Sequence, residues 1–307
     1  MGATAPTSVL LPTMRWTDAC EEVAEQLRPA DELLVICDTE LESVADRVDE
    51  YPDTVRLVVA GDPEGCSGKA NAIAAGMEAA EHDRIVWTDD DFHHPPDWLA
   101  QLCTDYERQG PTTEVPVFVG QDPLARLLEP THAISGTVAV FLADIPWAGS
   151  LVFDREDLGD EDAFLEDLRR TVSDDGILGE YVDMTPVRRT RRIPIGGSAR
   201  ETLENQVRFT QIVRYHDPTG FAVQAVVAAV FAAACLLFPL PALALTTLTT
   251  ASVYAAFGVR RWTFLAAYPA VLASIPLLVY ALVRRSFVWG GRRYRWKGKF
   301  HVTVEER

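Results

Sequence analysis

Lysine is almost absent from this sequence. Only three of the 307 residues are lysine, against 25 arginines, and acidic residues outnumber basic ones 45 to 28. A surface with this excess of negative charge repels phosphate, which argues against nucleic acid as a partner. Many carboxylates with few lysines also predict a halophilic protein, because high salt screens the self-repulsion that otherwise destabilises a compact acidic chain.

Cysteine is sparse and has no pattern. The five cysteines form no CxxC pair and no spacing typical of a metal site. Their spacing argues against a zinc-binding cysteine cluster. We expect these cysteines to be reduced and mostly buried as small apolar side chains. The first ten residues also lack the basic and apolar regions of a secretory signal, so we expect the acidic part of the chain to be cytoplasmic.

Charge is distributed very unevenly along the chain. Residues 1–216 contain 42 acidic and 18 basic residues, whereas residues 217–307 contain 3 and 10. No charged residue occurs in residues 221–257 or in residues 262–283. Since a membrane-spanning helix needs roughly 20 apolar residues, the first run predicts a helical hairpin turning at Pro239 and Pro241, and the second predicts one more span.

Arginines near residues 188–200 precede the first apolar run, which by the positive-inside rule predicts a multi-pass cell-membrane protein with its acidic domain in the cytoplasm. Three crossings would export the basic tail, so two spans with one re-entrant or interfacial segment remain an alternative. The predicted parts are an acidic domain (1–200), an amphipathic interface helix (201–219), two or three transmembrane helices (220–285) and a basic tail (286–307).

The acidic domain alternates apolar runs with amphipathic ones. We expect strands at residues 8–11, 32–37, 55–60 and 85–87, and helices at residues 18–27, 41–50 and 68–80. Strands separated by helices predict an α/β fold with a mostly parallel sheet, helices on both faces and a ligand site at the carboxyl ends of the strands.

Polar residues follow several of these strands. Asp38 ends the second strand, and Asp89, Asp90 and Asp91 end the fourth. Carboxylates spaced i, i+2 at a strand end can hold Mg²⁺ or Mn²⁺, which complete their shell with water and substrate phosphates. An acidic surface loop is the simpler alternative.

The loop at residues 61–69 superficially resembles a phosphate-binding loop. Ala70 stands where the GxxxxGK[ST] pattern needs a hydroxyl, which argues against a Walker-type NTPase. Lys69 is the single lysine of the acidic domain and lies at a predicted helix N-terminus, against the helix dipole. We therefore expect it to meet an anionic ligand, the alternative being a solvated surface lysine.

Further along the chain, Asp174 and Asp175 follow Ser173. Either carboxylate could act as a general base, or the three residues could simply cap a helix. Gly149 could let the backbone approach a ligand, and Arg214 lies in an amphipathic segment where it could face phosphates of lipid or substrate.

In this order the motifs resemble those of membrane-associated family 2 glycosyltransferases with a GT-A fold, of the processive or lipid-modifying type, nearest in layout to ceramide glucosyltransferases. The matching segments are SGKANAIAAG (67–76), the DxD pair Asp89 and Asp91, Gly149-Ser150, Asp174-Asp175, QIVRY (211–215) and VWGGRRY (288–294). Tyr215 departs from the Trp of the QxxRW pattern, and Asp174 from its usual Glu or Thr.

The resemblance implies an inverting hexosyltransferase that moves a sugar from a nucleotide-diphosphate sugar to a membrane lipid. It assigns donor binding to Asp38, Lys69, Asp89, Gln211 and Arg214, the metal (Mg²⁺ or Mn²⁺) to Asp89 and Asp91, the acceptor to Gly149 and Ser150, and catalysis to Asp174 and Asp175, with Asp175 as the base. One alternative is a processive polysaccharide synthase, for which two or three spans are few. The other is a non-catalytic membrane-anchored scaffold.

The halophilic interpretation predicts that the midpoint of thermal unfolding rises by several degrees between about 0.1 M and molar KCl, because the Debye length shrinks from about 10 Å to 3 Å. Circular dichroism in both salts measures it. Equal stability at low and high salt would contradict the interpretation.

Overall fold

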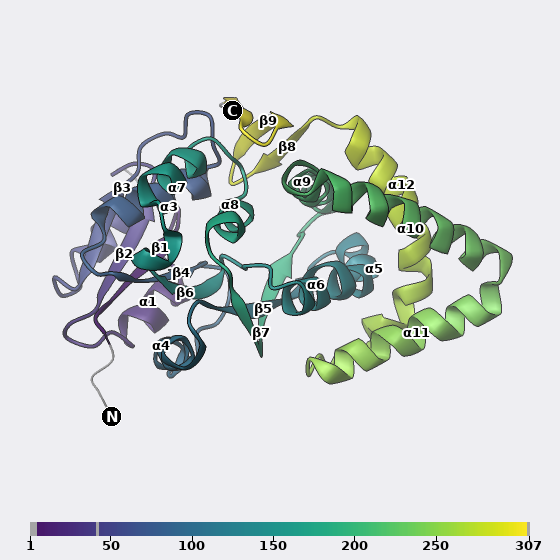
Figure 1. Ribbon diagram of the computed structural model, residues 1–307, viewed down its shortest axis with the longest axis horizontal. Coiled ribbons are helices and arrows are strands. Elements are labelled where there is room, and N and C mark those ends of the chain that lie inside the picture. The colour runs from purple at the N-terminus through teal and green to yellow at the C-terminus, as the bar shows by residue number, and fades with distance from the viewer. Residues whose placement is uncertain (1–4, 41–42, 306–307) are drawn as a thin grey trace. The chain divides into compact units, whose positions relative to one another are not determined.

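The computed structural model describes residues 5–40 and 43–305 (Figure 1). The chain forms two compact units. The first comprises Met1–Val115, Asp144–Val187 and Phe300–Val304, and the second comprises Pro116–Ala143, Arg188–Lys299 and Glu305–Arg307. Their boundary falls within two strands, β5 and β7, rather than at the predicted end of the acidic domain at residue 200.

A seven-stranded sheet has the order β3-β2-β1-β4-β6-β5-β7. Strands β1 to β4 are parallel, whereas β6 runs antiparallel to both β4 and β5. The fold is therefore mixed α/β with a largely parallel sheet, as predicted. The strands are β1 (Thr7–Pro12), β2 (Glu32–Cys37), β3 (Val55–Val59), β4 (Arg84–Thr88), β5 (Thr112–Gly120), β6 (Ser150–Asp154) and β7 (Thr185–Ile195).

Helices of the first unit cover both faces of the parallel strands, as predicted. They are α1 (Asp18–Ala24), α2 (Ser43–Val48), α3 (Gly68–Ala79), α4 (Trp98–Gln109), η2 (Arg155–Leu158), α7 (Glu161–Leu168) and α8 (Asp174–Tyr181). The first two residues of the helix predicted at 41–50 lie outside the described residues.

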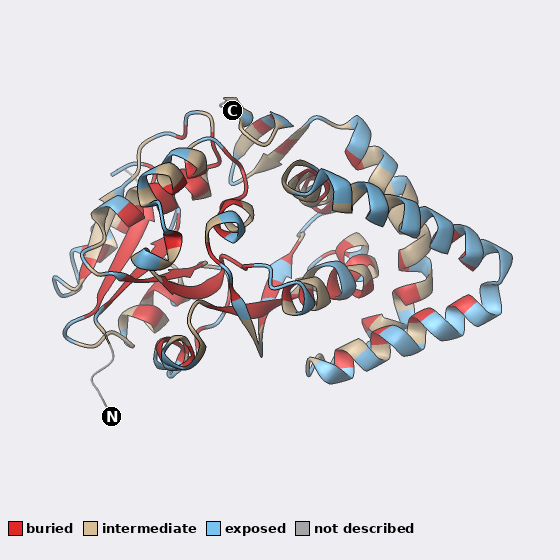
Figure 2. Ribbon diagram, viewed as in Figure 1, coloured by how far each residue is buried: buried red, intermediate tan, exposed pale blue. Residues whose placement is uncertain are grey.

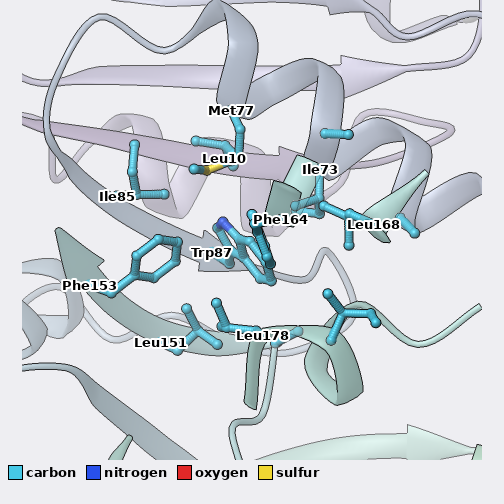
Figure 3. Close-up of a cluster of buried hydrophobic side chains, with 14 of the residues drawn as sticks. Leu10, Ile73, Met77, Ile85, Trp87, Leu151, Phe153, Phe164, Leu168 and Leu178 are labelled. Carbon is cyan, nitrogen blue, oxygen red and sulfur yellow. The ribbon is translucent and has the colours of Figure 1, made fainter. Parts of the chain in front are cut away.

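Alternation along β1 divides the core into two layers. Leu10 points to the face covered by α3, α7 and α8, whereas Val9 and Leu11 point to the face covered by α1, α2 and α4. Figure 3 shows the first layer, in which Trp87 of β4 packs against Phe153 and Phe164. The strand that leads to the Asp89–Asp91 loop is thus buried on both sides.

Gly76 lets α3 lie close to the sheet. A Cβ atom at this position would meet Ile36 Cδ1 at 2.4 Å and Leu10 Cδ2 at 2.9 Å. The last glycine of the SGKANAIAAG segment is therefore a packing requirement, and it fixes how the helix that begins at Lys69 sits on β1 and β2.

The second unit is largely helical. Its elements are α5 (Pro123–His132), the π-helical turn η1 (Ala133–Val138), α6 (Ala139–Leu142), α9 (Ala199–His216), α10 (Pro218–Leu237), α11 (Pro239–Ala256), η3 (Trp262–Ala266), α12 (Ala267–Val283), β8 (Ser286–Trp289) and β9 (Arg292–Gly298); β10 (His301–Glu305) follows. The predicted turn at the prolines is confirmed, since α10 ends and α11 begins there.

Two stretches of the second unit are long and apolar enough to cross a membrane, Pro218–Leu237 and Trp262–Val283. Within the apolar 18-residue window of each stretch, only 11% and 17%, respectively, is buried inside the protein. Figure 2 shows most of α10 and α11 as exposed.

We predict that Gly76→Val lowers the free energy of unfolding by about 2 kcal/mol, because the added methyl groups overpack the interface between α3 and the sheet. Ala75→Val, at a half-buried position of the same helix, is the matched control and should cost less than about 1 kcal/mol. Urea unfolding in high salt measures both. Equal losses would show that the close approach at Gly76 is unimportant.

Candidate active site

The parallel strands bring polar residues to one edge of the sheet. Strand β1 has β2 on one side and β4 on the other, so the chain reverses its direction of winding there. Crevices at such a switch point, outside the carboxyl ends of the strands, are the usual ligand sites of α/β folds. Asp38 follows β2 and Asp89 follows β4, two strand spacings or about 10 Å apart along the edge.

Lys69 lies between two carboxylates. Its ammonium nitrogen is 2.6 Å from Asp89 Oδ1 and 3.2 Å from Asp174 Oδ2. All three side chains are largely buried, with exposed fractions of 16%, 25% and 6%. Three segments far apart in the sequence, which the sequence analysis singled out separately, thus meet at one cation. The predicted anionic partner of Lys69 is, in this structure, a pair of the protein's own carboxylates.

Ser67 holds two of these segments together. Its backbone N–H donates to Thr171 O and its hydroxyl to Val172 O, both at 2.9 Å, while the same hydroxyl caps α3 by accepting from the Ala70 N–H. The start of α3, with Lys69, is therefore fixed beside the segment that leads into α8. Asn71 bonds the carbonyls of Ala60 and Gly61 and fixes the preceding loop.

Burial sets the protonation of this group. Desolvation, together with the negative charges of Asp175 and Asp89, raises the pKa of Asp174 to about 6, although Lys69 opposes the shift. The two carboxylates raise the pKa of Lys69 above its ordinary value despite its burial. The lysine therefore stays charged, and Asp174 is its buried counter-ion.

Asp175 has a different environment from Asp174. It lies in the first turn of α8, half-buried, and its Oδ1 accepts hydrogen bonds from the Ser173 hydroxyl at 2.6 Å and the Gly176 N–H at 3.0 Å. Ser173 caps the helix, as one of the two interpretations predicted. Of the two carboxylates, Asp175 is the one that solvent reaches.

Thr13 is a site residue that the sequence analysis missed. It follows β1, and its hydroxyl lies 2.5 Å from Asp90 Oδ2. Burial raises the pKa of Asp90, and this hydrogen bond opposes the shift. The rule that located Asp38 and Asp89, that ligands collect after parallel strands, would have located Thr13 after the first strand.

Two carboxylates follow β4 at a spacing that suits a divalent metal. Asp89 is half-buried and Asp91 is exposed, at i, i+2 beyond β4. Within residues 5–40 and 43–305, no group of three or more His, Cys, Asp and Glu side chains could hold a metal ion. This donor set fits Mg²⁺ or Mn²⁺ arriving with a diphosphate, since Mg²⁺ is typically held by one or two carboxylates plus phosphate oxygens and water.

The neighbouring histidines are engaged with α1. His93 Nδ1 lies 2.6 Å from a Glu22 carboxylate oxygen, and the His94 N–H donates to the other at 2.7 Å. His94 Nε2 lies 2.6 Å from the Thr88 hydroxyl. These contacts position the loop after Asp91.

The acceptor contact predicted for Ser150 is not supported. Its side chain is fully buried, donates to Glu114 Oε2 at 2.6 Å and accepts from Trp98 Nε1 at 2.9 Å. Gly149 is also buried, because a Cβ there would meet the Trp147 ring at 2.2 Å. Its carbonyl accepts from the Asp89 N–H at 3.3 Å. The backbone of Gly149 therefore holds the start of the loop that carries Asp89, Asp90 and Asp91.

Gln211 and Arg214 belong to α9 in the second unit. The Gln211 side chain is buried and donates to Arg284 O at 2.7 Å, which is a packing role rather than the predicted donor contact. Arg214 is exposed, and its guanidinium lies 5.6 Å from the centre of the Tyr215 ring. Its contact with the donor stays a prediction.

These features define an α/β protein with a cluster of acidic residues around Lys69 at the carboxyl edge of its parallel strands. A family model described as glycosyl transferase family 21 matches residues 36–300. The chain therefore belongs to glycosyl transferase family 21, which confirms the predicted glycosyltransferase class and replaces family 2 by family 21. No curated protein matches the sequence.

Several solved structures are similar at low identity. One, described only as a mycobacterial protein, is 16% identical over 62% of this chain and 66% of that chain, with a TM-score of 0.40. Glucosyl-3-phosphoglycerate synthase from Mycobacterium tuberculosis, in complex with Mn²⁺, uridine-diphosphate-glucose and phosphoglyceric acid, is 16% identical over 69% of this chain and 78% of that chain, with a TM-score of 0.43.

Removing the charge of Lys69 should destabilise the protein. In Lys69→Met the Asp89 and Asp174 carboxylates face each other without their counter-ion, and we expect a loss of about 3 kcal/mol at pH 8. The loss should shrink towards pH 5, because protonation of Asp174, whose pKa is already raised, removes the repulsion. Thermal unfolding at both pH values measures this.

Lys297→Met, at an exposed position of β9, is the control and should change stability little. A Lys69→Met loss that is the same at pH 5 and pH 8 would contradict the counter-ion role.

Proposed function

We propose that this family 21 protein is an inverting transferase with a GT-A catalytic domain, which moves a sugar from a nucleotide-diphosphate sugar to a membrane lipid. The observation that carries the proposal is the meeting of Lys69, Asp89 and Asp174 at the carboxyl edge of the parallel strands. A solvated surface lysine would not be buried between two carboxylates, and an ordinary acidic surface loop would not enclose a cation.

The donor would lie along this edge. Asp38, buried beyond β2, would contact the nucleotide base, and the diphosphate would lie towards Asp89, about two strands away. Lys69 lies in the first turn of α3, and it would turn from Asp89 towards the incoming phosphates.

Asp89 and Asp91 would hold Mg²⁺ or Mn²⁺ with the donor. When bound, such an ion offsets the charge that develops on the leaving diphosphate. The protein's own part is to keep Asp89 in place, through the Gly149 carbonyl and the buried strand β4 that precedes it.

Asp175 would be the base. It is the solvent-accessible carboxylate of the pair, and hydrogen bonds from the Ser173 hydroxyl and the Gly176 N–H to its Oδ1 hold the side chain in place. It would accept the proton of the acceptor hydroxyl as that oxygen attacks the anomeric carbon from the face opposite the diphosphate, which inverts the configuration. Asp174 would act through Lys69 rather than on the acceptor.

The acceptor would be a lipid. Apolar side chains of α10 and α11 are exposed over most of their length, and exposed apolar surface of this extent marks a membrane or partner site. Arginines before and after these helices and the acidic first unit agree with a cell-membrane protein whose catalytic domain is cytoplasmic.

The assignment of the base predicts that Asp175→Asn lowers sugar transfer from a radiolabelled nucleotide sugar into extractable lipid by about 10²- to 10⁴-fold. Nucleotide affinity should stay within about threefold of wild type, since the loss is confined to the chemical step. Asp183→Asn, an exposed carboxylate just beyond α8, is the control. Unchanged transfer in Asp175→Asn would rule out this residue as the base.

A further inference from the structure

The second unit carries a pair of helices whose connecting turn, here called the tip, is apolar and exposed. Helices α10 and α11 diverge from a shared turn like the arms of a V (Figure 1). The turn reads Leu237-Phe238-Pro239-Leu240, and the exposed fractions of Leu237, Phe238 and Leu240 are 75%, 63% and 77%. The nearest charged residues along the chain are Asp217 and Arg260, at the far ends of the two arms.

Both open ends of this V are attached to the neighbouring helices α5 and α9. Helix α10 follows α9 directly, with Asp217 capping its start. In the last turn of α11, Tyr254 hydrogen-bonds Thr263 at 3.1 Å. Beyond the helix end, Arg261 forms an ion pair with buried Glu129 of α5 at 2.7 Å. Because α5 packs against α9, the two open ends are attached to the same pair of helices.

Helix α12 is attached at both of its ends to the same two helices, α5 and α9. Before its start, Arg261 and Thr263 bond Glu129 of α5. At its end, the Arg284 carbonyl accepts from Gln211 of α9, and the Arg284 guanidinium lies 3.6 Å from Glu204. Helix α12 also packs along both α5 and α9, and these charged partners are unsuited to hydrocarbon.

Length argues in the same direction. At 1.5 Å per residue, the 20 residues of α10 extend about 30 Å and the 18 of α11 extend about 27 Å. Helix α10 thus just matches a hydrocarbon core of about 30 Å, and α11 is slightly shorter than it. Arms that diverge must tilt, so their shared tip stops short of the far surface. A turn on the far side would moreover expose Phe238 and Leu240 to water.

We infer that α10 and α11 form a re-entrant hairpin that enters the bilayer from the cytoplasmic side and turns within the hydrocarbon, while α12 lies in the interface and does not cross. The inference rests on the membrane attachment in the proposed function. Its partner is the acyl-chain region of a bilayer. The acidic first unit and the basic strand β9 then lie on one side, which removes the conflict between three crossings and the positive-inside rule.

Single cysteines test this arrangement in the full-length protein. Asp162→Cys reports the side of the membrane on which the first unit lies, and Lys297→Cys reports it for strand β9. Leu240→Cys reports the position of the tip. Each replaced side chain is exposed. The five native cysteines are buried, so wild-type protein measures background labelling. The probe is a membrane-impermeant maleimide, applied to sealed vesicles of either orientation in high salt.

We expect residues 162 and 297 to be labelled from the same side, and residue 240 from neither side until detergent is added. A nitroxide at residue 240 should be more accessible to oxygen than to a water-soluble nickel complex. Labelling of residue 240 from the opposite side would overturn the re-entrant hairpin, and labelling of residue 297 from the opposite side would overturn the interfacial α12.

A wash with alkaline carbonate separates this inference from the proposed function. Protein that stays in the pellet while residue 240 is labelled from the far side refutes only the hairpin. Protein released into the supernatant refutes membrane embedding itself, and with it the lipid acceptor.

Discussion

One buried cation organises the proposed active site. The sequence avoids lysine almost everywhere, yet Lys69 is fixed between Asp89 and Asp174. In a partly desolvated site an unpaired carboxylate is costly, so this ammonium is what allows two acidic segments to approach each other before any ligand is present. A donor diphosphate would offer Lys69 a negative partner, and a divalent ion would offer Asp89 a positive one. Lys69 and Asp89 could then give up their mutual ion pair and bind these ligands instead.

A re-entrant anchor would give this site a consistent setting. An enzyme held in one leaflet meets lipid head groups from the side on which its nucleotide donor is dissolved, and it needs no path for its product through the bilayer. This disfavours the processive synthase, which requires a translocating channel. The non-catalytic scaffold is disfavoured by family membership and by the buried lysine.

Much of the fold was predictable because its signals are local. Apolar runs located β1 to β4, and the prolines located the turn between α10 and α11. Residue roles that depend on tertiary contacts were not predictable. Ser150 shows no sequence sign of its buried bonds to Glu114 and Trp98. Lys69 was expected to meet a ligand because it opposes the helix dipole, and nothing local pointed to Asp174, which is 105 residues away. Strand β5 and helix α5 lie in a region for which periodicity gave no prediction.

The central claim is that the edge bearing Asp89 and Lys69 binds a nucleotide diphosphate together with a divalent metal. Thermal unfolding of the detergent-solubilised protein in high salt, with a series of nucleoside diphosphates and with or without Mn²⁺, tests it most directly. We expect a rise in the unfolding midpoint that needs both Mn²⁺ and one particular nucleotide, and that Asp91→Ala abolishes. No shift with any nucleotide, or a shift that Asp91→Ala leaves intact, would contradict it.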